Sequence, residues 1–151
     1  MMEPTIAYLH FVSILSVTAF LVTELYLCSR DLQPPQVKTL AQVDFLYMVA
    51  AIAVLVSGLL RLFAVGKGAG FYLHNPVFYI KIALFVAVGL ISILPTLQFI
   101  RWNRALKAGA DRILRDSDIV TARRYVALEL ALLALIPLTA VLMARGIGVQ
   151  P

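Results

Sequence analysis

The sequence predicts an all-α integral membrane protein, a bundle of four transmembrane helices with both termini outside. Three observations support this prediction. Of the 151 residues, 62% are hydrophobic and only 14% are charged, and the mean hydropathy is +0.92. The apolar residues fall into four runs of about 20 residues, the length at which a helix crosses a bilayer. The basic residues gather beside these runs, as they do in cytoplasmic loops.

The four apolar runs form one transmembrane domain that spans the whole chain. They cover residues 4–28, 44–65, 76–100 and 125–144. The first run contains Glu24, and it has neither a basic segment before it nor a small-residue cleavage site after it. We therefore expect a retained helix and not a removable signal peptide.

Residues typical of helix ends and turns separate the runs. Residues 29–43, with Pro34 and Pro35, predict a short polar loop between the first and second runs. Asn75 and Pro76 supply an N-cap and a first-turn proline for the third run. Arg145 and the glycine after it close the fourth run.

The basic residues predict the orientation. Seven of them lie between the third and fourth runs: Arg101, Arg104, Lys107, Arg112, Arg115, Arg123 and Arg124. Because cytoplasmic loops carry such an excess, we place this connection inside, and alternation then puts both termini outside. The net charge of +5 is explained by this bias, so we expect no nucleic-acid partner. The predicted location is the plasma membrane.

Ionisable side chains inside the runs are the candidate functional residues, because such groups are costly in hydrocarbon. In the predicted topology four of them belong to the outer leaflet: His10, Arg61, His74 and Lys81. Two acids, Glu24 and Glu129, lie near the inner ends of the first and fourth runs. We expect these two acids to be able to pass protons toward the cytoplasm.

Each of these residues also has a structural interpretation. The histidines could be interfacial residues bonded to backbone carbonyls, and Arg61 and Lys81 could extend to the outer headgroups. The two glutamates could pair with arginines of the inner loop. These alternatives stay open on the sequence alone.

Cationic and imidazole side chains in one leaflet favour a bound ligand that carries both carboxylates and a metal ion. Haem iron takes neutral imidazole as an axial ligand, and haem propionates pair with arginine or lysine. A copper site could use His10, His74 and the thioether of Met48, although copper chemistry gives no reason for both cations. The sequence contains no HExxH zinc motif and no recognisable Ser/His/Asp signature. Its single cysteine, Cys28, excludes an intramolecular disulfide.

Several segments resemble known membrane protein families. YLHFVSILSVTAFLVTELY in the first run, SGLLRLF in the second and YLHNPVFYIKIAL in the third resemble HemJ-type proteins, which oxidise protoporphyrinogen and bind haem b. An LHNP…K…P…RW pattern, at residues 73–76, Lys81, Pro95 and residues 101–102, is similar over nearly the whole chain to an uncharacterised bacterial family of the CopD-like group.

The HemJ-type resemblance implies roles for His10 and Lys81, which match the first-span histidine and third-span lysine of that family. The chain departs from the family in one spacing, because HemJ-type proteins have an HxK pattern where six residues separate His74 from Lys81 here. The resemblance therefore favours a bound tetrapyrrole more than the particular oxidase reaction.

We therefore predict a membrane redox protein that binds haem b, a candidate oxidoreductase that acts on a tetrapyrrole or passes electrons to quinone. His10 would be an axial ligand and His74 a second one, while Arg61 and Lys81 would hold carboxylates. Lys81, Glu24 and Glu129 are the candidate catalytic residues. Two alternatives remain, a copper-handling protein of the CopD-like type and a non-catalytic accessory subunit of a membrane complex. A homo-oligomer is compatible with all three.

Overall fold

The computed structural model is all-helical over the residues that it describes, which are 2–65, 70, 73–110 and 113–145. The main helices are α1 (Met2–Leu27), α2 (Pro34–Leu60), α4 (Pro76–Lys107) and α5 (Asp116–Ala144), and a π-helical turn, η1 (Arg61–Val65), continues α2. All four main helices are long and apolar enough to cross a membrane. The predicted all-α class with four spans is therefore confirmed.

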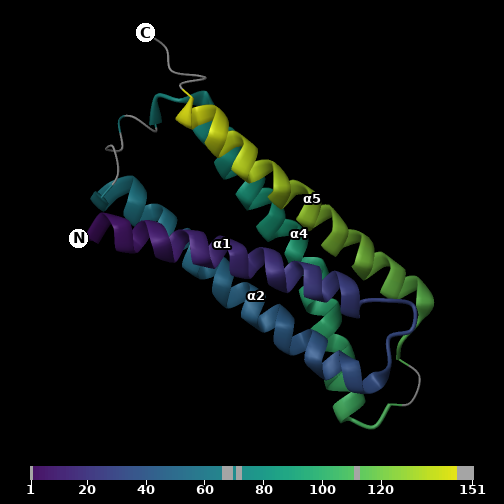
Figure 1. Ribbon diagram of the computed structural model, residues 1–151. Coiled ribbons are helices and arrows are strands. Elements are labelled where there is room, and N and C mark those ends of the chain that lie inside the picture. Colours follow the sequence, from purple (N-terminus) through teal and green to yellow (C-terminus); the bar gives the residue numbers. More distant parts are fainter. Residues whose placement is uncertain (1, 66–69, 71–72, 111–112, 146–151) are drawn as a thin grey trace.

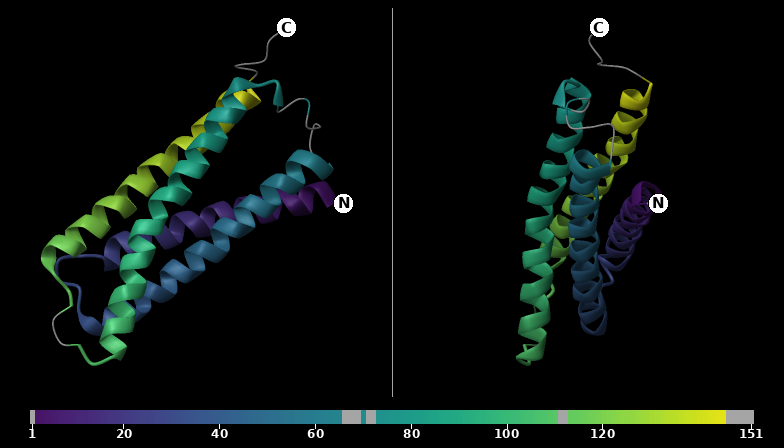
Figure 2. Two further views of the ribbon diagram at one scale, coloured as in Figure 1. Left: turned by 180° about the vertical axis from the view of Figure 1, so that it is seen from behind. Right: turned by 90° about the vertical axis from the view of Figure 1, so that its left-hand side faces the viewer.

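The helices form two hairpins that meet at one end (Figure 1). Helix α1 packs chiefly on α2, and α4 packs chiefly on α5, while α2–α4 and α1–α5 contacts join the two pairs. The views in Figure 2 show the hairpins diverging away from the end where α1 leads into α2 and α4 leads into α5. We call this the closed end, and we call the other end, where α1 begins and α5 finishes, the open end.

The packed core lies in the closed half. It consists of Val17, Leu21, Cys28, Leu32, Val37, Leu40, Tyr47, Ala50, Phe99, Trp102, Ile119, Ala122 and Val126. Many apolar side chains outside this core are exposed, including Leu15, Leu90 and Leu138, which are all more than half exposed. Exposed aliphatic side chains all along the helices are what a surrounding lipid phase requires. The 32 residues of α4 make about 48 Å of helix, which exceeds the ~30 Å hydrocarbon core.

Helix α2 begins at Pro34, so the polar loop expected to continue to residue 43 is wrong. The helix starts with prolines at its first positions, and the Gln36 side chain accepts a hydrogen bond of 2.9 Å from the Gln33 backbone N–H. Val37 and Leu40 are fully buried in the core. Polar composition suggested a loop, whereas the spacing of these two buried residues places them on one helix face.

The other helix ends also differ from the limits of the apolar runs. Asn75 is the N-cap of α4, as predicted, and its Oδ1 accepts a hydrogen bond of 2.9 Å from the Val77 backbone N–H. Helix α4 continues to Lys107 and α5 begins at Asp116, so most of the basic cluster lies on helical turns at the closed end. Arg112, and the glycine after Arg145, lie outside the described residues. Asp116 and Asp118 in the first turn of α5 complement its helix dipole.

Candidate functional site

His10 lies between the two helices of the first hairpin, near the open end. Its side chain is buried, with 7% of its surface exposed, and its Nδ1 lies 2.8 Å from the Ser57 Oγ on α2. Gly58 lies beside the ring, and a Cβ at this position would stand 3.4 Å from His10 Cε1, in ordinary van der Waals contact. The imidazole is therefore held by packing as well as by a hydrogen bond.

The hydrogen bonds of the Ser57 hydroxyl favour one tautomer of His10. That hydroxyl donates to the backbone carbonyl of Ala53 at 2.6 Å, so its single proton is engaged. In the bond with His10 the Ser57 oxygen therefore accepts, and Nδ1 of the neutral imidazole carries the proton. The lone pair then resides on Nε2, which is a nitrogen that binds metals in proteins.

Two cations from separate elements accompany His10. Arg61 begins η1 and Lys81 lies in the second turn of α4, and both are close enough for their charges to act on the imidazole. The two cations also interact with each other. The Arg61 guanidinium lies 5.9 Å from the ring centroid of Phe11, a cation–π distance. Three of the four outer residues selected from the sequence therefore come together in space.

His74 has a different environment. It is exposed, and its Nδ1 lies 2.7 Å from the carbonyl oxygen of Gly70, just before the start of α4. This bond is local, because Gly70 lies four residues back along the chain. The structure thus places His74 at the open end without joining it to His10.

Met48 does not join the histidines either. Its side chain is 45% exposed, and it lies nine residues before Ser57 on α2, which is about 13 Å along the helix. The donor set His10, His74 and Met48 is therefore not assembled in the structure. Within the described part of the chain, no group of three or more His, Cys, Asp or Glu side chains is placed to hold a metal ion.

A second polar site lies in the closed half, and it contains both glutamates predicted from the sequence. Glu24 on α1 and Glu129 on α5 are each 1% exposed, and they are near enough to interact electrostatically. Asp44 on α2, which is 5% exposed, interacts with both. We call Glu24, Asp44 and Glu129 the carboxyl cluster.

Hydroxyl groups satisfy part of the carboxyl cluster. The Tyr47 hydroxyl donates to Glu129 Oε2 at 3.1 Å, and the Thr96 hydroxyl donates to Asp44 Oδ1 at 2.6 Å. Glu24 Oε1 and Glu129 Oε1 are buried and have no hydrogen-bond partner. Buried acceptors of this kind are rare in folded proteins and call for a specific explanation.

Sequence reasoning missed Asp44, Tyr47 and Thr96 as members of this site. The expected polar loop ended at residue 43, so Asp44 stood at a helix start, where an acid is unremarkable. With α2 beginning at Pro34, Asp44 lies well inside the helix. Asp44 and Tyr47 are three residues apart and therefore share a face, a spacing that could have indicated the site.

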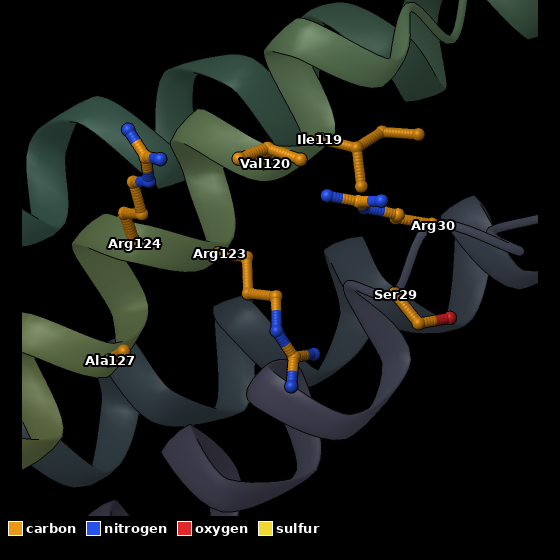
Figure 3. A pocket seen from close by; sticks show the side chains of 7 residues that line it. All are labelled: Ser29, Arg30, Ile119, Val120, Arg123, Arg124 and Ala127. Carbon is orange, nitrogen blue, oxygen red and sulfur yellow. The ribbon is translucent and has the colours of Figure 1, made fainter.

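A cavity of about 480 Å³ opens at the closed end, and Figure 3 shows the side chains that line it. Its lining consists of Ser29, Arg30, Ile119, Val120, Arg123, Arg124 and Ala127. Arg123 connects the hairpins here, because its guanidinium donates to the backbone carbonyls of Leu25 and Cys28. These carbonyls belong to the C-terminal end of α1, where a cation complements the helix dipole.

Comparison with known proteins places the chain in a family. A family model described as "Predicted membrane protein (DUF2214)" matches residues 2–148. The chain belongs to this family. Searches of the curated proteins and of the solved structures gave no significant match.

Membership of the DUF2214 family agrees with the four apolar helices of the structure. The match covers both hairpins, so the site at the open end and the carboxyl cluster both belong to the family domain. The family description states a membrane location and no activity. The function must therefore be argued from the two polar sites.

Proposed function

We propose that this protein is a membrane redox protein that binds haem b at the open end, where His10 would hold the iron. It would act on a tetrapyrrole or pass electrons to quinone in the inner membrane of a bacterium. The observation that carries the proposal is the buried His10 imidazole with two cations from other elements beside it. The HemJ-type resemblance around His10 and Lys81 is a separate sequence argument for the same guest.

The first support is the state of the imidazole. A metal-binding histidine normally donates its second ring N–H to an oxygen, which fixes the ring and its tautomer. Ser57 performs this role for His10 through the 2.8 Å contact at Nδ1. Nε2 would then be the nitrogen offered to iron.

The second support is the charge around the site. Haem b carries two propionates, and carboxylates pair well with arginine and lysine in surroundings of low dielectric constant. Arg61 and Lys81 supply these two charges from η1 and α4. Without an anion, two interacting cations beside a buried imidazole would be an expensive arrangement.

The third support is the shape of the bundle. The four-helix core ends in the closed half, and the hairpins diverge toward the level of His10 (Figures 1 and 2). Side chains at that level, such as Phe11 and Ile82, are exposed to the surroundings. A large planar apolar guest would cover surface that the protein itself leaves open.

When bound, haem b supplies a one-electron redox centre. The residues of the chain would do the rest. His10 would hold the iron, Arg61 and Lys81 would hold carboxylates, and Glu24 and Glu129 would hold protons in the closed half. His74 remains a candidate second ligand, supplied by the segment before α4.

The test is absorption spectroscopy of protein purified after expression with ample haem. We expect a Soret band that is lost in His10→Ala and weakened in the double variant Arg61→Ala/Lys81→Ala. Leu15→Ala, a change at an exposed position on the same helix, should leave the band unchanged. His74→Ala reports on the second ligand through the shape of the spectrum, and circular dichroism confirms that each variant is folded.

Purification of the folded wild type without a bound tetrapyrrole would contradict the proposal. Metal analysis of the same sample tests the copper alternative, which requires copper that is lost in Met48→Ala. If neither cofactor is present and His10→Ala only weakens a membrane complex, the accessory-subunit alternative holds.

A further inference from the structure

Three helices each contribute one carboxyl group to the interior of the closed half. Glu24, Asp44 and Glu129 are at most 5% exposed, and each lies in a helix that is long and apolar enough to span a membrane. Carboxyl groups in such segments are costly and usually functional. Two of them, Glu24 and Glu129, have an oxygen atom that is buried and lacks a hydrogen-bond partner.

Among the described residues, no lysine or arginine is found in contact with the carboxyl cluster to compensate its negative charge. Helix α2 adds the Tyr47 phenol, which donates to Glu129, and α4 adds the Thr96 hydroxyl, which donates to Asp44. Beyond Glu24 lies the Cys28 thiol, and the Arg123 guanidinium acts on that thiol and donates to backbone carbonyls. The cluster thus combines three acids with hydroxyl groups.

The two glutamate oxygens without a partner need a hydrogen-bond donor, and a protonated carboxyl group is one. An ionised carboxylate only accepts hydrogen bonds, whereas a protonated carboxyl group also donates one. A proton added to one member of the cluster removes a negative charge and creates a donor for a neighbouring oxygen. In this step an O–H bond forms, no bond within the protein breaks, and no electron is transferred.

We infer that the carboxyl cluster is a proton-binding site, which exchanges protons with water through the cavity at the closed end. The cavity touches both segments that carry the glutamates. Ser29 lines it just after the end of α1, and Arg123 lines it from α5 (Figure 3). Arg123 also donates to the backbone carbonyls of Leu25 and Cys28, in the turn that follows Glu24. The Cys28 thiol is in turn near enough to Glu24 to interact with it. The inference extends the proton-holding role of Glu24 and Glu129 in the proposed function, but it does not require haem.

The first experiment is an infrared titration of haem-free protein in lipid nanodiscs. We expect a carbonyl-stretch band of buried protonated carboxyl groups that shifts in D₂O and is replaced by carboxylate bands as pH rises. Glu24→Gln, Asp44→Asn and Glu129→Gln should each remove part of this band. Glu3→Gln, which changes an exposed acid of α1, should leave the band unchanged.

Tyr47→Phe provides a variant that keeps every carboxyl group. It removes the donor to Glu129 Oε2, so the band should shift in frequency without losing intensity. The absence of a protonated-carboxyl band at every accessible pH, or spectra of the folded cluster variants identical to the wild type, would overturn the inference. Because the sample contains no haem, these outcomes do not depend on whether His10 binds iron.

The second experiment tests the route. After a rapid change from H₂O to D₂O, the band should shift more slowly in Ala127→Trp than in the wild type, because the indole fills the cavity. Leu128→Trp places the same bulk at the next position, where the side chain is exposed and does not line the cavity. Equal exchange rates in Ala127→Trp and the wild type would overturn access through this cavity.

Discussion

A single hydroxyl group sets the chemistry available to the buried histidine. Ser57 donates to its own helix backbone, which favours a tautomer of His10 with the imidazole proton on Nδ1, donated to the Ser57 oxygen. The sequence predicted that His10 was important but not which nitrogen would be available. The tautomer depends on the partner that α2 brings to His10, and that partner lies 47 residues away.

Ser57→Ala should destabilise the protein by about 1–3 kcal/mol, because it leaves a buried ring N–H without its acceptor. Ser57→Thr keeps the hydroxyl and should stay near the wild type. The free energy of unfolding in mixed micelles measures the difference. Equal stabilities of the alanine and threonine variants would show that the hydrogen bond contributes nothing.

The thiol of Cys28 should be unreactive for a physical reason. Burial raises its pKa from 9.0 to about 11, although the nearby Arg123 charge opposes the shift. The thiolate is the reactive form, so at pH 8 its fraction should be roughly 100-fold lower than for an unperturbed thiol. Maleimide labelling should be slow and should accelerate as pH rises.

The matched control for Cys28 is its neighbour. Ser29→Cys in a Cys28→Ala background places a thiol in the lining of the cavity, where labelling should be faster. Comparable rates at the two positions would contradict the burial of Cys28 in the folded protein.

At the scale of the elements, helix ends were the least predictable feature. Residues 29–43 are polar and contain two prolines, which together suggested a loop, yet the prolines begin α2. Proline suits the first helical turn, where its missing N–H has no partner to lose. Because α2 begins at Pro34, Asp44 and Tyr47 lie in the bundle interior and not at a helix start. The sequence alone therefore did not identify every member of the carboxyl cluster.

The start of α4 offers a test of one cap. Asn75 is buried, and its side chain accepts from the Val77 backbone N–H. Asn75→Ala should lower the free energy of unfolding by about 0.5–2 kcal/mol, whereas Asn75→Ser retains a capping oxygen and should cost less. Thermal unfolding followed by circular dichroism distinguishes them, and equal midpoints would argue against a capping role.

At the scale of the whole molecule, the two hairpins share their core near the closed end. Most basic residues of the connections lie at that same end, including Arg30, Arg104 and Arg115. The positive-inside bias therefore predicts that the closed end faces the cytoplasm and that the open end, with His10, faces outward.

The orientation can be tested in a bacterial inner membrane with single cysteines in a Cys28→Ala background. Glu3→Cys at the open end should react with a membrane-impermeant maleimide in intact spheroplasts. Asp31→Cys at the closed end should react only after permeabilisation. The reverse pattern would show that the protein inserts with its termini inside.

The sequence by itself determined the class of this protein. The length of each apolar run and the scarcity of charged residues within it are local properties that can be read from the chain. It also singled out His10, Arg61 and Lys81, since charges in apolar runs stand out wherever the helices pack. Tertiary structure decided which of these residues meet. It joined His10 to Ser57, left His74 apart, and completed the carboxyl cluster with Asp44. Such pairings depend on helix register and on the angle between the hairpins, which no local pattern specifies.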